Sequence, residues 1–167
     1  NVTVGGFADT LATSPYATAI DWAVEKGITA GTSDTAFSPD NKCTTAQILT
    51  FLWRAVDCPE PANSANPFND VKADDYFYKP ALWAYEKGLV SGSQFTPDTL
   101  CTRAVAVTYL WRLAGSPSAQ TGGFSDVPAT SDYAQAVAWA VAKGVTNGSG
   151  ASTFSPENTC TRGQIVT

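Results

Sequence analysis

Apolar positions recur along this chain with the spacing of helices that have one buried face. The clearest example is Ile20, Ala23 and Val24, which lie three and one positions apart and would form a single stripe on a helix. The same pattern, each time followed by Lys-Gly, predicts three amphipathic helices, over residues 15–26, 76–87 and 132–143. A lysine near the last carbonyls and a glycine in a left-handed conformation are common at helix ends.

A second kind of segment is apolar almost all round. The runs Ile-Leu-Thr-Phe-Leu-Trp at 48–53 and Ala-Val-Thr-Tyr-Leu-Trp at 106–111 have no polar face, which is typical of a helix that is buried on most sides. We therefore expect these second helices to lie centrally and the amphipathic first helices to lie outside them. The cations that follow the tryptophans, Arg54 and Arg112, are interpreted as structural groups near helix C-termini.

Capping residues predict where both kinds of helix begin. Ser14-Pro15 would start the earliest first helix, and Asp75 and Ser131 or Asp132 would cap the other two. For the second helices, a threonine followed three positions later by glutamine predicts a capping box at Thr44 and Thr161. Thr102 is followed by valine at that position, so we expect a cap without the reciprocal bond.

These elements belong to an internal repeat that occurs three times. Each copy begins with Phe-x-Asp, has Trp-Ala fifteen residues after the phenylalanine, continues through two glycines four residues apart, and ends with Phe-x-Pro and Cys-Thr. The phenylalanines that open the copies are Phe7, Phe68 and Phe124, which are 61 and then 56 residues apart. Because a lone unit of about this size would hardly bury a core, the repeats are expected to share one.

The predicted fold is therefore all-α: three helix-loop-helix repeats packed as a pseudo-threefold bundle. We place repeat 1 at residues 1–61, repeat 2 at 62–118 and repeat 3 at 119–167, and the second helix of repeat 3 is cut short at Thr167. The linkers between repeats are rich in proline, glycine and serine. From the start without methionine and this early stop we expect a fragment of a larger chain.

Composition narrows the function classes. The 167 residues include 10 Lys+Arg, 15 Asp+Glu and no histidine, for a formal net charge of −5. An acidic chain with few cations is unsuited to nucleic acid. The absence of histidine excludes imidazole-based catalysis and imidazole metal ligands. No apolar run is long enough for membrane insertion, and we expect no cofactor and no metal.

The remaining candidate groups have structural interpretations. The repeated carboxylates Asp9, Asp70 and Asp126 are explained by turn or cap roles, and no pair of carboxylates suggests a glycosidase. The three tryptophans of the first helices are expected in the core. Three of the four cysteines are repeat-matched, at Cys43, Cys101 and Cys160. We interpret these as buried, free thiols, which could pair only if the axis brought their Cα atoms within about 7 Å.

The repeat resembles the S-layer homology (SLH) family, over nearly the whole chain. The family's second helix starts with a string of the Ile-Thr-Arg-Ala-Glu type, which appears here as Cys-Thr-Arg-Ala-Val at 101–105 and Cys-Thr-Arg-Gly-Gln at 160–164. The copy at 43–47 has Thr45 where the arginine belongs. The resemblance implies a non-enzymatic module that is part of a larger extracellular protein at the cell surface, within the cell wall or S-layer.

The resemblance also implies a ligand, a secondary cell-wall polysaccharide linked to peptidoglycan and made anionic by pyruvate. An arginine in the first turn of a helix combines a guanidinium with free N–H groups, which suits a carboxylate. The site residues expected in grooves between repeats are Arg103, Arg162, Thr102, Thr161, Thr44, Tyr16, Phe77 and Tyr133. The alternatives are an ion pair for the two arginines and, for the module, a structural or protein-interaction repeat without glycan binding.

Overall fold

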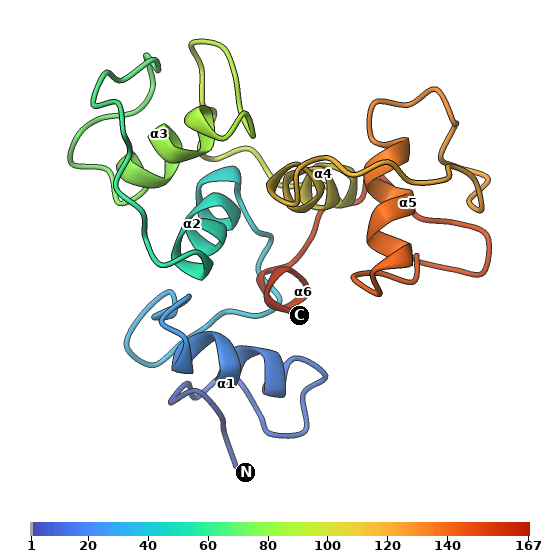
Figure 1. Cartoon of the computed structure of the whole chain (residues 1–167). Coiled ribbons are helices and arrows are strands. Elements are labelled where there is room, and N and C mark those ends of the chain that lie inside the picture. Colours follow the sequence, from blue (N-terminus) through green and yellow to red (C-terminus); the bar gives the residue numbers. More distant parts are fainter. Residues whose placement is uncertain (1) are drawn as a thin grey trace.

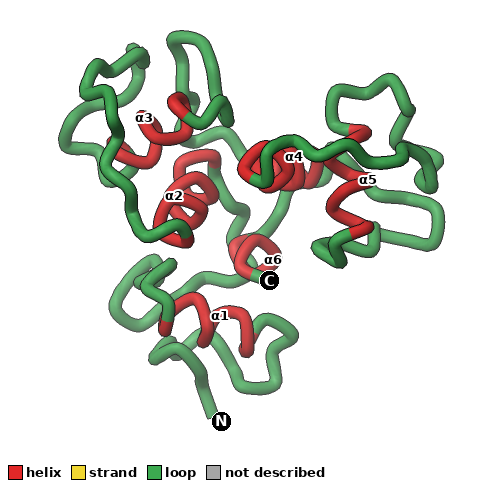
Figure 2. The backbone as a smooth tube through the Cα atoms, viewed as in Figure 1, coloured by secondary structure: helices red, strands yellow, loops and turns green. Residues whose placement is uncertain are grey.

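The computed structural model describes residues 2–167 and is all-α in this range, as predicted. The described helices are α1 (Ala17–Glu25), α2 (Thr45–Ala55), α3 (Tyr78–Glu86), α4 (Arg103–Leu113), α5 (Ala134–Ala142) and α6 (Arg162–Val166). Figures 1 and 2 show α2, α4 and α6 near the centre, with α1, α3 and α5 on three separate prongs. Extended backbone pairs only at isolated bridges among the described residues.

The outer helices α1, α3 and α5 begin later than the sequence predicted. Their N-cap residues are Tyr16, Phe77 and Tyr133, and none of them makes a side-chain cap bond. The predicted cap Asp75 instead accepts a hydrogen bond from the backbone N–H of Lys72 at 2.7 Å. Ser14 likewise accepts a hydrogen bond from the backbone N–H of Tyr16 at 3.2 Å, so in repeats 1 and 2 the predicted cap residue stabilises a turn before the helix.

The inner helices begin as predicted. Thr44 and Thr161 form complete capping boxes with the glutamines three residues later. Thr102 accepts a hydrogen bond from the backbone N–H of Val105 at 3.3 Å, without a reciprocal bond. These three caps fix the first turn of each inner helix, where the candidate arginines lie.

Helices pack across repeat boundaries rather than within one repeat. The inner helix of one repeat contacts the outer helix of the next, as α2 with α3 and α4 with α5, and α6 closes the ring onto α1. The helix pairs that pack together, α2 with α3, α4 with α5 and α6 with α1 (Figure 1), therefore each combine two different repeats. Every groove between prongs consequently includes residues from more than one repeat.

The three repeat-matched cysteines lie at the centre of this ring. The backbone N–H of Cys43 donates to the carbonyl of Cys160 at 2.9 Å, that of Cys160 to Cys101 at 2.9 Å, and that of Cys101 to Cys43 at 2.8 Å. The closed cycle joins all three repeats through their backbones. The three side chains are buried and their thiols are free, as predicted.

The repeated Phe-x-Asp carboxylate holds the loop that leads to each inner helix. Asp9 accepts hydrogen bonds from the backbone N–H groups of Phe37 at 2.9 Å and Ser38 at 2.7 Å. Asp70 and Asp126 make the equivalent pairs, all between 2.7 and 2.9 Å. Desolvation raises the pKa of Asp9, but the two N–H donors outweigh it, and the pKa lies below its ordinary value. The predicted turn role is confirmed.

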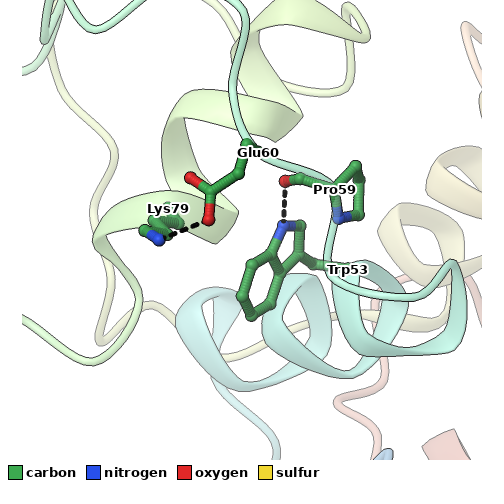
Figure 3. A network of polar contacts seen from close by, with 4 residues as sticks. All are labelled: Trp53, Pro59, Glu60 and Lys79. Carbon is green, nitrogen blue, oxygen red and sulfur yellow. Dashed lines mark hydrogen bonds and ion pairs between the residues drawn. The ribbon is translucent and has the colours of Figure 1, made fainter.

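The linker after each of the first two inner helices is bonded to a tryptophan of that helix, among other contacts. The indole Nε1 of Trp53 donates to the carbonyl of Pro59 at 2.8 Å (Figure 3). Trp111 makes the same bond to Pro117 at 2.8 Å. Figure 3 also shows Glu60 against Lys79 of α3, an exposed pair at 2.6 Å.

The outer-helix tryptophans do not share one environment. Trp83 is buried, as predicted, with 2% of its surface exposed. Trp22 is 48% exposed, so its predicted place in the core is wrong. Trp139 is partly buried and packs against the core of repeat 3. The difference depends on which residues cover each helix, because neighbouring residues of repeats 1 and 2 in the largest core cluster complete the burial of α3.

Candidate ligand-binding grooves

Three grooves lie at equivalent places beside the starts of the inner helices. Each takes its polar lining from a Gly-Phe loop, from one inner helix and from the first turn of another inner helix. The residues at the equivalent first-turn position are Arg162, Thr45 and Arg103, and we name the grooves after them.

The Arg162 groove has a volume of about 440 Å³ and combines residues of all three repeats. Its lining includes two cations, Arg54 and Arg162, and no carboxylate. The rest of the lining is Thr29, Gly31, Thr32, Gln47, Thr50, Phe51 and Tyr76. Hydroxyl, amide and guanidinium groups thus surround a space without a negative charge of its own.

Arg162 is held by groups that leave part of its guanidinium unsatisfied. Its Nε donates to the carbonyl of Phe37 at 2.9 Å, and its Cζ lies over the rings of Phe37 and Phe51 at 4.7 and 5.2 Å. The side chain is only 3% exposed, and the buried Nη2 has no hydrogen-bond partner. An unpaired buried donor of a charged group is costly, so this nitrogen favours an oxygen ligand.

The pKa of Arg162 also reflects its burial in this groove. Burial lowers the pKa of Arg162 below its ordinary value, although Cys43, Tyr76 and Asp9 oppose the shift. The alternative that Arg162 and Arg103 form ion pairs is wrong, because the pair between Lys79 and Glu60 is the only ion pair among residues 2–167. Asp9, the acidic residue that acts on Arg162, is already bonded to two backbone N–H groups.

The Arg103 groove is smaller and more apolar. Its volume is about 270 Å³, and most of its lining is aliphatic or aromatic. Arg103 Nε donates to the carbonyl of Phe154 at 2.7 Å, and Nη2 donates to the hydroxyl of Thr146 at 3.3 Å. The partner that Arg162 lacks is therefore present here. Arg103 also lines a neighbouring surface hollow that contains Lys42 and Glu157.

In the Thr45 groove, the first turn of α2 contributes a threonine where the other two grooves have an arginine. The hydroxyl of Thr45 donates to the carbonyl of Thr99 at 3.2 Å. The groove has a volume of about 460 Å³, and its lining includes one cation, Arg112, and one carboxylate, Asp132. This balance is less favourable for an anion than that of the Arg162 groove.

The predicted threonines lie beside the arginines but serve as caps. Thr44, Thr102 and Thr161 each accept a backbone N–H from the third helical residue. None of the three lines one of the grooves named here. Their bonds orient the first turn and hence the arginine that follows.

The matched aromatics at the starts of the outer helices occupy different places. Tyr133 lines the Thr45 groove. Phe77 is buried and stacks on Phe95 with ring centroids 5.7 Å apart. Tyr16 packs against α6, where a Cβ added to Gly163 would lie 2.5 Å from its Cδ2. The glycine that departs from the family string therefore makes room for the ring of Tyr16.

Several groove residues were missed or given another role in the sequence interpretation. Arg54 and Arg112 line grooves, and each also donates to a carbonyl after an outer helix, Ile28 at 3.3 Å and Leu89 at 3.0 Å. Their structural role is confirmed but is not their only one. Tyr76 differs in type from its repeat counterparts Pro15 and Asp132, so no repeated signal marked it.

Metal-binding clusters and membrane-spanning helices are both absent from residues 2–167. Between residues 2 and 167, no group of three or more Asp, Glu, Cys or His side chains is placed to hold a metal ion. None of the described helices is both long and apolar enough to cross a bilayer.

Comparison with known proteins links the whole arrangement to one family. The S-layer homology domain model matches residues 6–49, 67–104 and 123–166. An endoglucanase of Bacillus sp. (strain KSM-635) is 33% identical over 84% of this chain and 16% of that protein. An amylopullulanase of Thermoanaerobacterium thermosulfurigenes is 27% identical over 88% of this chain and 8% of that enzyme.

A third relative, a cell surface protein of Thermoanaerobacter kivui, is 31% identical over 65% of this chain and 15% of its own length. The chain therefore spans less than a fifth of each of these proteins. Three family matches in tandem cover most of the chain, at the same three repeats that the sequence and the threefold structure define. The chain belongs to the S-layer homology family.

Proposed function

We propose that this chain is a non-catalytic module that anchors a larger protein to the cell wall by binding an anionic wall polysaccharide in the grooves between repeats. The observation that carries the proposal is the buried, incompletely bonded guanidinium of Arg162 in a groove that has no carboxylate. A pyruvate-bearing or otherwise acidic sugar would supply the missing acceptor. The relatives' names, two carbohydrate-active enzymes and a cell surface protein, support a module shared between surface proteins.

The grooves are proposed to contribute unequally. Arg162 has an unsatisfied nitrogen and a second arginine, Arg54, in the same groove. Arg103 already donates to Thr146, and the lining of the Thr45 groove includes a carboxylate as well as a cation. We therefore place the principal anion site at Arg162 and a weaker one at Arg103. Multiple occupied grooves would increase attachment through effective concentration rather than through a tighter single site.

Cosedimentation with purified cell walls tests the proposal. Intact walls should pellet the chain, and walls stripped of their secondary polysaccharide should not. Arg162→Gln should reduce wall affinity by about 10- to 100-fold, the range of a lost charge-assisted hydrogen bond. Arg103→Gln is the matched control and should cost less. Circular dichroism of each variant verifies that it is folded.

Two results would contradict the proposal. Equal pelleting with stripped walls would mean that the polysaccharide is not the ligand and would favour the structural or protein-interaction role. Full wall affinity in folded Arg162→Gln would mean that anion recognition does not depend on this guanidinium.

A further inference from the structure

The Thr45 and Arg162 grooves can be compared position by position, because the repeat places equivalent residues in equivalent parts of their linings. Their volumes are similar, about 460 and 440 Å³. Some matched positions keep the same residue type in both grooves, namely Thr50 and Thr108, and Arg54 and Arg112. The grooves therefore differ in the chemistry of particular side chains and not in their size or construction.

Three other matched positions lose a group that suits an anion. The corresponding residues of the Arg162 and Thr45 grooves are Arg162 and Thr45, Tyr76 and Asp132, and Gln47 and Val105. A guanidinium, a phenol and an amide are thus replaced by a hydroxyl, a carboxylate and an apolar side chain. Because all three replacements disfavour an anion, the Thr45 groove is better suited to a different kind of ligand than to a weaker version of the same one.

The Thr45 groove combines an exposed apolar wall with polar groups of no net charge. Leu100 is 44% exposed and Val105 is 37% exposed, and both line the groove. Large apolar side chains left exposed around a hollow are typical of a ligand-binding groove. The ring of Tyr133 is partly buried in the same lining, and the side chains of Arg112 and Asp132 contribute one positive and one negative charge. This lining suits an uncharged ligand that has both apolar and polar faces.

From this comparison we propose that the Thr45 groove binds an uncharged N-acetylated hexosamine unit, so that different grooves of one module bind chemically different units. The inference rests on the proposed function, in which the grooves bind a wall polysaccharide. The methyl of the acetamido group matches the apolar wall of Leu100 and Val105. Its N–H and carbonyl match the acceptor of Asp132 and the donors of Arg112.

The remaining surface of such a sugar also has a counterpart in the groove. One face of a hexosamine ring presents C–H groups, and the ring of Tyr133 offers a flat, amphipathic surface for that face. A sugar that carried a carboxylate would bring it into a lining that already contains Asp132, and like charges brought together oppose binding. Charge thus selects the neutral unit at this groove and the acidic unit at the Arg162 groove.

A titration of the isotope-labelled chain with two related sugars, followed by NMR, tests the inference. N-acetylglucosamine is uncharged, and N-acetylmuramic acid is the same sugar with an added lactyl carboxylate. The methyl signals of Leu100 and Val105 and the ring signals of Tyr133 should move with N-acetylglucosamine. N-acetylmuramic acid should bind there about two- to fivefold more weakly, and its uncharged methyl ester, which controls for size, should bind more tightly than the acid. The ring signals of Phe51 in the Arg162 groove should show the opposite preference.

Two variants at exposed positions separate the contributions. Asp132→Asn removes the carboxylate, so the preference against N-acetylmuramic acid should disappear while N-acetylglucosamine still binds. Val105→Gln introduces the residue that forms the capping box in the other two repeats, so the fold should be retained. Loss of the apolar side chain should weaken N-acetylglucosamine binding about threefold. Arg162→Gln is the control that should leave the titration at the Thr45 groove unchanged.

The outcomes distinguish this inference from the proposed function. Signals of the Thr45 groove that do not move with N-acetylglucosamine would overturn the inference, and so would equal or tighter binding of N-acetylmuramic acid there. Either result leaves the proposed function intact if pelleting with walls still depends on their polysaccharide and on Arg162. An unchanged preference in folded Asp132→Asn would overturn the selection by charge.

Discussion

Gly163→Ala tests the packing of α6 against α1, which closes the ring. An added Cβ would lie 2.5 Å from Cδ2 and 2.8 Å from Cγ of Tyr16. The whole aromatic ring of Tyr16 would therefore have to move, rather than only the far end of its side chain. Overpacking of this kind costs about 1–3 kcal/mol. Alanine offsets up to about 1 kcal/mol through its better helix propensity. We expect the free energy of unfolding to fall by about 1–2 kcal/mol and the Tm by about 2–8 °C.

A double-mutant cycle separates the clash from helix propensity. In the Tyr16→Ala background the aromatic ring is gone, and Gly163→Ala should become neutral or stabilising, which gives a coupling energy of about 1–3 kcal/mol. Urea unfolding monitored by circular dichroism measures each corner of the cycle. The matched control is Ala104→Gly at the equivalent position of α4, which should destabilise through lower helix propensity and the loss of one buried methyl group. A Gly163→Ala chain that is stabilised equally with and without the ring of Tyr16 would refute the reasoning.

Three further predictions concern the loops and linkers. The pKa of Asp70 is lowered because two backbone N–H donors outweigh its desolvation. Its contribution to stability is therefore present above its unfolded pKa near 3.8 and is lost as the pH falls below that value. Asp70→Asn should flatten this acid dependence in urea unfolding measured between pH 6 and 3. Gly31→Ala should cost well over 2 kcal/mol in the same assay, because the new Cβ would lie 2.5 Å from the ring of Phe7 at a φ of +87°, whereas Gly27→Ala, with open space at a φ of +69°, should cost only about 1 kcal/mol. Trp111→Phe removes the 2.8 Å indole bond to the linker and should lower the free energy of unfolding by about 1 kcal/mol, with faster proteolysis of the linker as the visible sign.

Local signals in the sequence predicted the inner part of the fold well. The Thr-x-x-Gln pairs at Thr44 and Thr161 determine a capping box through atoms three residues apart. Such short-range chemistry depends little on the rest of the chain. The repeat spacing in turn predicted the threefold bundle, since three copies of one apolar pattern bury it best against one another.

Predictions failed where tertiary partners decide the outcome. Asp75 has the chemistry of a cap but bonds within a preceding turn. Trp22 and Trp83 are the same residue at the same repeat position, yet one is 48% and the other 2% exposed. Neither difference is encoded within a window of local sequence, because it depends on which residues of other repeats cover that face.

The candidate site was predictable in part for the same reason. The sequence places an arginine in the first turns of α4 and α6, and the repeat marks their equivalence. What distinguishes them is the partner of one nitrogen, Thr146 for Arg103 and none for Arg162. Partners drawn from another repeat cannot be read from the motif itself.

The closure of α6 onto α1 has a consequence for how the module comes apart. Linear solenoids lose their terminal units first, because an end unit has a neighbour on one side only. Here each outer helix packs on an inner helix of another repeat, and the first and last helices are neighbours as well. Every repeat therefore packs against the other two, so unfolding that begins at one end of the chain is suppressed. Hydrogen exchange of the inner-helix amides should then report one global opening event shared by all three prongs.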